Sequence, residues 1–356
     1  MHPNRFEKPA MNLKQLSELL SLSQTTVSRA LNGYPEVSEA TRIRIQAAAQ
    51  VHGYAPNMRA RSLATGRTQA IGHVIPVSAK HEMVNPVFAD FVAGAGEIYS
   101  KNGHDMLLSV VTDDQEEAAY RAFKAKRNVD GIILHGPRRG DPRIPLLNQI
   151  GLPFVVHGRS SDSTEDYAWV DVNNTQAFER ATRFLLDLGH RRIALINGLA
   201  HMDFAIRRQC GFDAAHADRG LTPDPTLMLS GEMTETYGFE AARSLLARPD
   251  PPTAFLVSSM ITTIGVRRAA EERRLTLGRD ISVITHDDEL SYFRNGAEVA
   301  LYTATRSSVR QAGRRAAEVL LDIIRGGTGP RQVLLEADLT LGQSTGPAPT
   351  PVRGRS

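Results

Sequence analysis

The sequence predicts an α/β protein with an N-terminal head of three helices and a larger core of two lobes, each lobe a parallel αβα sheet. Two observations support this prediction. Residues 12–32 contain two short amphipathic segments joined by a tight turn. From residue 70 onward, strand-like and helical segments alternate, and the alternation restarts near residue 190. Regular alternation of this kind specifies a parallel sheet with helices on both faces.

The second helix of the head has an unusual polar side. Ser23 is a good N-cap for this helix, and its apolar side is formed by Val27, Ala30 and Leu31. The opposite side is short, rich in hydrogen-bonding groups and carries a single charge. A helix in a DNA major groove needs such side chains, because they allow close approach and supply donors and acceptors for bases and phosphates. These side chains are Gln24, Thr25, Thr26, Ser28 and Arg29.

The pattern favours a helix-turn-helix, although helical hairpins inside enzymes can show it too. A third helix is capped by Ser38 and closed by Gly53, so the head is expected to span residues 11–56. Residues 1–10 are expected to be a disordered leader, and translation could start at Met1 or at Met11. The apolar positions expected in the first and third helices are Leu13, Leu16, Leu19, Leu20, Ile43, Ile45, Ala47, Ala48 and Val51.

Composition sets broad limits on the kind of protein. A chain of 356 residues with 41% hydrophobic residues is long enough for more than one domain with a sizeable core. It contains no apolar run of transmembrane length and no apolar signal segment, so we expect a cytoplasmic protein without a membrane partner. The single Cys210 excludes an internal disulfide and a cysteine-based zinc site, and is expected to be a small core residue on a helix.

Charge is distributed unevenly along the chain. Residues 1–68 contain nine Lys and Arg against four Asp and Glu, a net +5, whereas the remainder carries −2. A basic head on a nearly neutral core suits a polyanionic partner for the head alone. Residues 57–68 include Arg59, Arg61 and Arg67 and no acidic residue. Alone they are too short for a stable helix, and a plain basic linker is the simplest interpretation.

The core is expected to span residues 69–345. Its first lobe should contain residues 69–173 and 305–335, its second lobe residues 190–300, and residues 346–356 should form a disordered tail. The strands expected from the sequence are 71–75, 106–111, 129–134, 153–156, 193–197, 227–230, 254–258, 281–285 and 332–335. The helices expected are 88–102, 115–126, a helix ending over 146–150, 174–188, 211–219, 236–246, 261–273 and 309–325.

Several sequence words, in order, resemble those of the lactose-repressor (LacI) family of bacterial transcription regulators. The head carries TTVSRALNGYPEVSEATR and then GYAPNMRARSLATGRT, and the core carries NPVF, VDGII, DVNN, LGHRRIA, RQCGF, SVI with DD, and a terminal ST. The resemblance covers residues 12–345, and its specificity comes from the order of many weak words. It implies a periplasmic-binding-protein-like core. The stretches LSLSQTTVSRALNGYPEV and HEMVNPVFADF are most similar to α-glucoside regulators of rhizobia-like bacteria.

The resemblance implies roles for residues of the head and the linker. Gln24, Thr25 and Arg29 would read bases, whereas Thr26, Ser28 and Asn32 would hold phosphates. In the family the linker folds into a hinge helix only on DNA, and paired leucines wedge into the minor groove. Wedging unstacks and bends the duplex, at a cost of a few kcal/mol that extra contacts offset. Here that leucine is Leu63, with Asn57 and Ala60 at the matching contact positions.

The resemblance also implies a pocket for a small-molecule effector between the lobes, where open sheets bind ligands beyond the carboxyl ends of their strands. Arg208 and Asp287 are the strongest candidates, since a guanidinium and a carboxylate can grip vicinal sugar hydroxyls in bidentate fashion. Asp287 could instead cap a local turn, and Phe88 could be a core residue instead of a platform for a sugar. The ligand candidates are Phe88, Arg159, Arg208, Met233, Ser259 and Asp287.

Three departures from the family pattern limit what can be said of the effector. The aromatic platform of the family is Met233 here, its Ala-Asn-Asp reads Ser258-Ser259-Met260, and the Asp of its Ile-Asp-Arg is Gly158, preceded by His157. A sugar such as an α-glucoside is the expected effector, and a non-sugar metabolite acting as corepressor is an alternative. No cofactor and no metal site are expected.

Two other protein classes compete with this interpretation. An enzyme could use His286-Asp287-Asp288, but the glycines Gly94 and Gly96 lie inside a helical run, and neither HxxxH spacing nor a GxSxG elbow occurs. A transport-linked sugar-binding protein would have a signal peptide and no basic head. We therefore expect a ligand-responsive repressor of a carbohydrate operon. A helix-turn-helix head reads a palindromic operator only as a pair, so a homodimer is expected.

Overall fold

Three capped helices form the head in the computed structural model, which describes residues 11–54, 67–76 and 85–349. They are α1 (Leu13–Leu20), α2 (Gln24–Leu31) and α3 (Glu39–Val51). Asn12 and Gln15 form a capping box on α1, and the hydroxyl groups of Ser23 and Ser38 accept the backbone N–H groups of Thr26 and Thr41. The expected capping residues therefore start α2 and α3.

A small apolar cluster holds the three helices of the head together. Its buried members are Leu16, Leu20, Val27, Ala30, Val37, Ile45 and Ala49. Four of the apolar residues expected in the first and third helices are instead exposed, namely Leu19, Ile43, Ala47 and Val51. Ile45 and Ala49, four residues apart, form the buried stripe of α3, and Ile43 and Val51 lie off that stripe.

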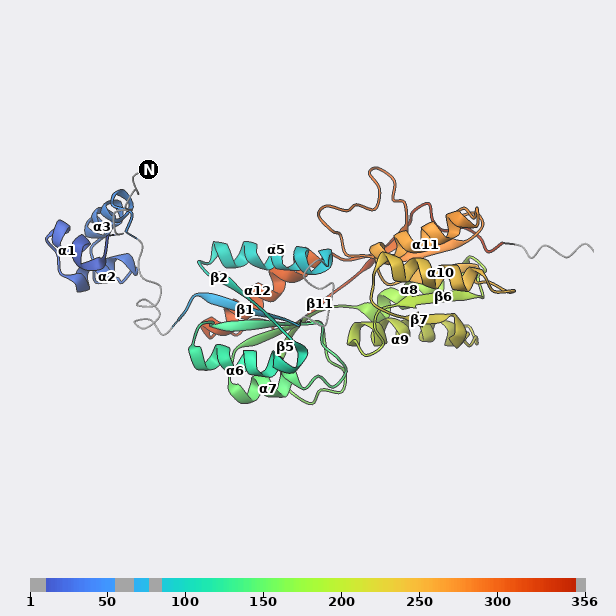
Figure 1. Ribbon diagram of the computed structural model, residues 1–356, viewed down its shortest axis with the longest axis horizontal. Helices are drawn as coiled ribbons and strands as arrows, with labels where there is room; N and C mark the ends of the chain where they lie inside the picture. Colours follow the sequence, from blue (N-terminus) through green and yellow to red (C-terminus); the bar gives the residue numbers. More distant parts are fainter. Residues whose placement is uncertain (1–10, 55–66, 77–84, 350–356) are drawn as a thin grey trace, which may run out of the picture. The chain divides into compact units, whose positions relative to one another are not determined.

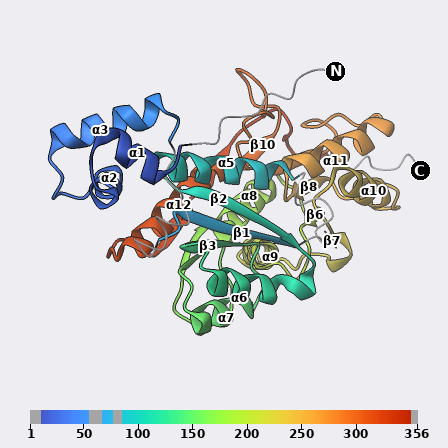
Figure 2. The same ribbon diagram turned by 60° about the vertical axis from the view of Figure 1, so that its left-hand side comes forward.

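The core begins at Ala70, and its first lobe is a six-stranded parallel sheet in the order β11-β5-β4-β3-β1-β2. The strands are β1 (Ala70–Pro76), β2 (Asp105–Val111), β3 (Gly131–His135), β4 (Phe154–His157), β5 (Ala168–Val172) and β11 (Gln332–Leu335). The helices are α5 (Pro86–Lys101), α6 (Glu116–Lys126), α7 (Arg143–Ile150) and α12 (Val309–Arg325), with a short 3-10 turn η2 (Asp113–Gln115). Helices α5 and α12 cover one face of the sheet and α6 and α7 the other (Figures 1 and 2).

The second lobe repeats this architecture with the order β12-β10-β9-β8-β6-β7. Its strands are β6 (Ile193–Asn197), β7 (Met228–Ser230), β8 (Ala254–Val257), β9 (Ser282–Asp287), β10 (Thr303–Arg306) and β12 (Asp338–Thr340), of which β12 is antiparallel to β10. Its helices are α8 (Asn174–Asp187), α9 (Asp203–Ala217), α10 (Glu235–Leu246) and α11 (Met260–Glu272), with the turn η3 (Pro225–Leu227). Helices α8 and α9 pack on one face, and α10 and α11 on the other.

The chain passes between the two lobes after β5, after β10 and after β11. Strands β5, β10 and β12 were not expected from the sequence, because they are short and interrupted by polar residues. The expected boundary was therefore wrong at this point: it placed residue 305 in the first lobe, whereas β10 belongs to the sheet of the second lobe. Gly346 and Ala348, assigned to the tail, are hydrogen-bonded to Ser282 and Leu188 in the second lobe.

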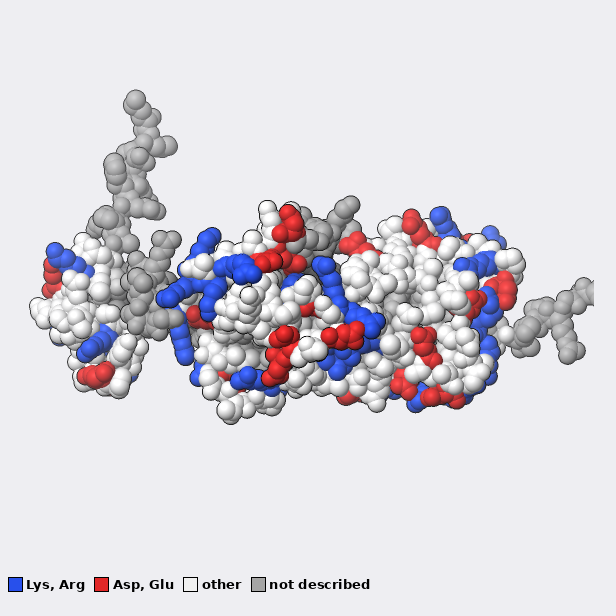
Figure 3. Space-filling model, turned by 90° about the horizontal axis from the view of Figure 1, so that it is seen from below, with Lys and Arg blue, Asp and Glu red and all other residues white. Residues whose placement is uncertain are grey.

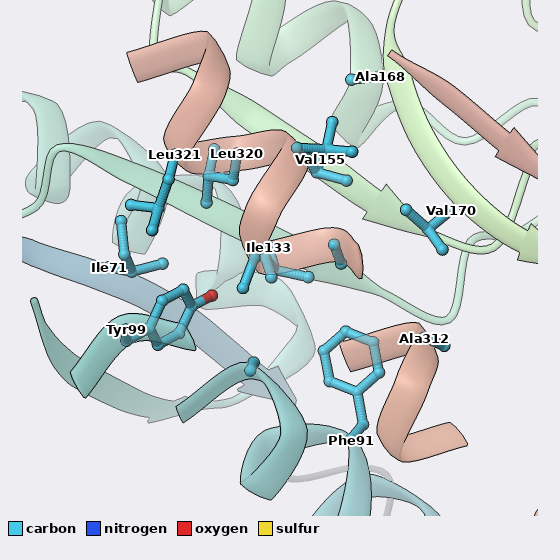
Figure 4. Packing of buried hydrophobic residues seen from close by; sticks show 14 of the residues in the cluster. Ile71, Phe91, Tyr99, Ile133, Val155, Ala168, Val170, Ala312, Leu320 and Leu321 are labelled. Atoms are coloured by element: carbon cyan, nitrogen blue, oxygen red, sulfur yellow. The ribbon is translucent and has the colours of Figure 1, made fainter. Parts of the chain in front are cut away.

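Helices α5 and α12 approach each other closely in the first lobe. Gly94 on α5 leaves no room for a Cβ atom, which would overlap the carbonyl oxygen of Arg310, and Gly313 on α12 faces the carbonyl of Phe91 in the same way. Beneath them lies the apolar cluster drawn in Figure 4, in which Ile71, Tyr99, Ile133 and Leu320 are fully or almost fully buried. Close contact between these helices and the sheet gives the first lobe a rigid frame for residues at the strand ends.

Candidate functional site

The polar face of α2 provides the candidate DNA-reading surface of the head. Gln24, Thr25, Ser28, Arg29 and Asn32 line one open groove, together with Leu13 and Tyr34. Leu13 and Tyr34 were not among the predicted contact residues, and the aromatic residue directly after the LNG turn was the signal that sequence reasoning missed. Figure 1 shows α2 beside α1 and α3 within the head.

Arg29 differs from the other basic residues of the head. Within residues 11–54, it is the one lysine or arginine without an ion pair or hydrogen bond: Lys14 pairs with Glu18, Arg42 with Glu39, and Arg44 binds the carbonyl of Leu20. Its guanidinium is therefore available for an anionic or base partner.

The other predicted DNA contacts are held by local bonds or lie outside the described residues. The hydroxyl of Thr26 bonds to Ser23 at 2.8 Å, and the amide of Asn32 donates to the carbonyl of Ser28 at 2.9 Å. These bonds orient the side chains at the start and end of α2. The predicted hinge residues Asn57, Ala60 and Leu63 lie outside the described residues.

Arg208 on α9 is the central charged group of the core. Its Nε donates to the amide oxygen of Asn174 at 2.8 Å, and its Nη1 donates to the carbonyl of Ser258 at 2.7 Å. Its guanidinium lies over the rings of Phe178 and Phe204, at 4.9 and 5.0 Å from the ring centroids. Burial lowers the pKa of Arg208 to about 10, although nearby carboxylates oppose the shift, so the side chain is charged at neutral pH.

A chain of polar contacts connects Arg208 with the other predicted arginine. Arg159 follows β4 in the first lobe and donates its Nε to Asp171 on β5 at 2.7 Å, with its guanidinium over the ring of Trp169. The amide of Asn174, at the start of α8, contacts Asp171 at 3.5 Å and accepts from Arg208. Both predicted arginines are thus brought together at the boundary between the lobes. Sequence reasoning did not select Asp171, within β5, or Asn174, which starts α8 directly after that strand.

The structure distinguishes between the two neighbouring carboxylates at the end of β9. Asp287 is buried, accepts the N–H of Glu289 at 2.9 Å and lies 3.7 Å from Arg306. Burial raises the pKa of Asp287. Asp288 instead lies 3.5 Å from the Nε2 of His286. Burial opposes its ionisation, but His286 and Arg208 together lower the pKa of Asp288. The turn-capping alternative for Asp287 therefore has direct structural support. Asp288 and Asp171 are the carboxylates whose charges counter the effect of burial on the pKa of Arg208.

The remaining predicted ligand residues occupy different positions around this boundary. Phe88 is buried on α5, and its ring stands edge-to-face with the ring of His135, with 5.1 Å between the centroids. Met233 is half-buried near Gly198, at the carboxyl end of β6. Ser259 is buried, and its hydroxyl caps α11 by accepting the N–H of Ile261 at 3.2 Å. Ser259 therefore has a structural role that the sequence pattern did not reveal.

Charges on the visible surface of the core are mixed. In Figure 3, basic and acidic side chains lie interspersed over the face that is shown. Many of them form ion pairs, such as Arg192 with Asp224 and Asp250. No helix in the described part of the chain has the length and apolarity needed to cross a membrane. Cys210, expected in the core, is exposed on α9.

A helix-turn-helix head and a two-lobed core with a buried arginine at the lobe boundary together define a class, the one-chain regulators that couple DNA reading to ligand sensing. Comparisons with known proteins agree at both ends of the chain. Residues 17–57 match the bacterial regulatory proteins of the lacI family, and residues 182–345 match a periplasmic binding protein-like domain.

Full-length relatives show the family directly. The chain is 45% identical over 340 residues to the HTH-type transcriptional regulator AglR of Rhizobium meliloti (strain 1021), covering 95% of each chain. It is 32% identical to the regulator CelR of Thermobifida fusca, covering 93% of this chain and 97% of that one. The chain belongs to the LacI family of bacterial transcription regulators.

Solved structures agree with the architecture. A complex of the transcriptional regulator CelR with cellobiose is 30% identical, with a TM-score of 0.69 over 94% of this chain and 99% of that chain. A lac repressor dimer bound to operator and an anti-inducer has a TM-score of 0.81 at 23% identity, over 94% of this chain and 99% of that chain, and it supports the fold alone. The predicted fold class is confirmed.

Proposed function

We propose that this chain is a cytoplasmic, non-enzymatic repressor of a carbohydrate uptake or catabolism operon that binds a palindromic operator as a homodimer. Its effector is a sugar of the α-glucoside class, bound between the lobes of the core. The observation that carries the proposal is the presence, in one chain, of a DNA-reading helix with an unpaired arginine and a buried Arg208 at the boundary between two lobes.

In the proposed complex, α2 lies in the major groove. Gln24, Thr25 and Arg29 are exposed, and they contact base edges. Thr26, Ser28 and Asn32, which are held by the local bonds at the two ends of α2, contact phosphates. Residues 57–68 form a hinge, in which Leu63 wedges into the minor groove and Asn57 and Ala60 support it.

The effector site combines groups from both lobes. Arg208 donates from Nε to the amide oxygen of Asn174 and from Nη1 to the carbonyl oxygen of Ser258, which fixes the plane of the guanidinium. Its remaining N–H groups would donate to a ligand hydroxyl. Asp288 is our candidate for the complementary carboxylate; the predicted Asp287 beside it stays a prediction, and the paired variants below distinguish the two. Phe88, Arg159, Met233 and Ser259 complete or support the site from the positions described above. A sugar that contacts both lobes would stabilise their closed arrangement, and coupling of this kind is typically about 1–3 kcal/mol.

Exposed apolar residues of the core suit a second copy of the chain. Leu108 and Val110 project from the edge strand β2 and are 44% and 51% exposed. In the second lobe, Tyr292, Val299 and Leu301 of the β9–β10 connection are also exposed. A homodimer that covers such patches would place two heads on the two halves of a palindrome.

A thermal-shift panel tests this proposal. Purified full-length chain is heated with maltose, sucrose, cellobiose and related metabolites, with and without DNA from upstream of its own gene. We expect one sugar to raise the melting temperature and to change the shift produced by the DNA. Stabilisation by a nucleobase or an amino acid alone would contradict the sugar assignment.

Paired variants separate the two carboxylates. Asp288→Asn should abolish the sugar-induced shift while leaving operator affinity intact, whereas Asp287→Asn should retain the sugar response. If Asp287→Asn alone removed the response, the original assignment of Asp287 as the ligand carboxylate would be correct.

A further inference from the structure

Three histidines lie close together at the strand ends of the first lobe, and nothing described so far uses them. His73 belongs to β1, His135 ends β3, and His157 ends β4. The Nδ1 of His73 lies 2.9 Å from the Nε2 of His135, and the hydroxyl of Tyr99 lies 3.3 Å from the Nε2 of His73. Within the described residues, no group of His, Cys, Asp or Glu has metal-binding geometry, so these imidazoles do not form a metal site.

The hydrogen-bond chain has a defined direction. Tyr99 is almost completely buried, and in the described part of the chain His73 is the partner of its hydroxyl. The hydroxyl must therefore donate to Nε2 of His73, because otherwise its proton would be buried without an acceptor. A neutral His73 then carries its proton on Nδ1 and donates it to Nε2 of His135. His135, also neutral, must carry its own proton on Nδ1.

Burial supports the neutral state of these imidazoles. It lowers the pKa of His73 to about 4 and the pKa of His135 well below its ordinary value, with His73 and His157 contributing further to the second shift. The hydroxyl of Tyr99 points in among the buried side chains of the first lobe (Figure 4). Arg143 also donates to the carbonyl of His135 at 3.3 Å, so both the backbone and the ring of this histidine are held in place.

The chain ends in a donor that lacks an acceptor. Nδ1 of His135 is buried and has no hydrogen-bond partner among the described residues. The rings of Phe88 and Phe91 stand edge-on to the imidazole, with centroids at 5.1 and 5.0 Å, and His135 as a whole is only half-buried. An unsatisfied buried donor is costly, and in native proteins it is rare unless a ligand or water completes it.

His135 lies beside the proposed effector site. It occupies the carboxyl end of its strand, the edge at which open sheets bind ligands. Phe88, a predicted ligand residue, packs against its ring, and the ring of His157, at the end of the neighbouring strand β4, lies 5.9 Å from it between centroids. An effector bound at these strand ends would therefore meet His135.

We propose that Tyr99, His73 and His135 form a relay that fixes Nδ1–H of His135 as a neutral donor to an uncharged hydroxyl or ring oxygen of the effector. This inference rests on the proposed function. His135 is the residue that contacts the ligand, and His73 and Tyr99 are positioning residues that set its tautomer. The first lobe thus recognises an acceptor oxygen without adding a charge, which suits an unphosphorylated sugar.

The relay itself is tested by imidazole nitrogen NMR on full-length protein labelled at histidine. We expect a proton on Nδ1 of His135 in the unliganded chain, and a mixture of tautomers at His73 and His135 in Tyr99→Phe. A deprotonated Nδ1 at His135, or spectra of these two residues that do not change in Tyr99→Phe, would overturn the relay.

Calorimetric titration with maltose, sucrose and cellobiose tests the acceptor. His135→Leu should weaken binding of the preferred sugar about tenfold, as expected for one buried hydrogen bond, and His135→Asn should recover part of the loss because its amide can donate. His104→Asn, at a half-buried histidine of the same lobe that contacts the carbonyl of Asn102 and takes no part in the relay, is the control and should bind as the parent does. Unchanged affinity in His135→Leu would overturn the contact.

The two failures are distinguishable. If the parent chain bound none of these sugars while Nδ1 of His135 carried its proton, the sugar would be wrong as the acceptor and the proposed effector class would fall, whereas the direction of the relay would stand. If the parent chain bound one of these sugars but Nδ1 of His135 carried no proton, the effector class would stand and the relay would fall.

Discussion

Asp203 connects the two lobes through a buried carboxylate, and its replacement should loosen the core. Asp203 is completely buried at the start of α9 in the second lobe. Its carboxylate accepts the N–H of Ser161 in the first lobe and pairs with Nε of Arg207 at 2.5 Å. Arg207 in turn donates to the hydroxyl of Ser161 at 3.1 Å, and the N–H of Asp203 donates to the carbonyl of Pro137 at 3.1 Å.

Asp203→Asn keeps the shape of the side chain but removes its charge. A hydrogen bond to a charged group contributes about 1.5–3 kcal/mol, and Arg207 is partly solvated, which reduces the penalty for losing its partner. We expect the free energy of unfolding of the core to fall by about 2 kcal/mol. Affinity for an effector that bridges the lobes should also fall, because the closed arrangement loses stability.

Urea denaturation followed by circular dichroism measures the change. The matched control is Asp162→Asn, next to Ser161 in the first lobe, where Asp162 and Arg139 form an ion pair and are 59% and 61% exposed, so the pair contributes about 0–1 kcal/mol. Equal stability of Asp203→Asn and Asp162→Asn would refute the view that the buried carboxylate holds the lobes together.

Three further predictions concern the head, the histidines and a helix contact. Arg29→Ala should cost about 1–3 kcal/mol in operator binding and relax discrimination at one base pair, and unchanged preferences in a binding-site selection would exclude this role. Burial lowers the pKa of His73 and of His157 to about 4 from an ordinary 6.5. Between pH 6.5 and pH 4 the unfolded chain therefore binds more protons than the folded chain, and the free energy of unfolding should fall by about 3 kcal/mol per histidine as the pH drops through this range. Urea denaturation midpoints that do not change with pH would contradict this prediction. Gly94→Ala should lower the free energy of unfolding by about 1–3 kcal/mol through overlap with Arg310, whereas Gly96→Ala, whose Cβ meets only Met106 at 3.8 Å, should be neutral or stabilising in the same denaturation assay.

Much of the fold follows from local sequence signals. Ser23 and Ser38 cap the helices that they were expected to cap, and the apolar runs of β3 and β8 are buried strands. Periodicity failed where polar residues are buried by tertiary contacts. Helix α9 starts at Asp203 and not near residue 211, because Asp203 and Arg208 are charged residues that the core buries through ion pairs and hydrogen bonds.

The sequence allowed the region of the candidate site to be predicted but not the contacts within it. The family resemblance pointed to Arg208 and to the end of β9. However, the choice between Asp287 and Asp288 depends on which way each side chain turns after the strand, and a sequence does not show this. Similarly, His73, His135 and Tyr99 are far apart along the chain, and only the parallel register of β1 and β3 brings the two histidines together.

Fluorescence anisotropy of labelled duplexes tests the central claim most directly. The full-length chain is titrated against double-stranded fragments from upstream of its own gene, with and without the panel of sugars. The account predicts salt-sensitive binding to one palindromic fragment and a change in that affinity when the preferred sugar is added. If the chain bound no fragment more tightly than random duplex, with every sugar tested, the proposed coupling between the head and the core would be contradicted.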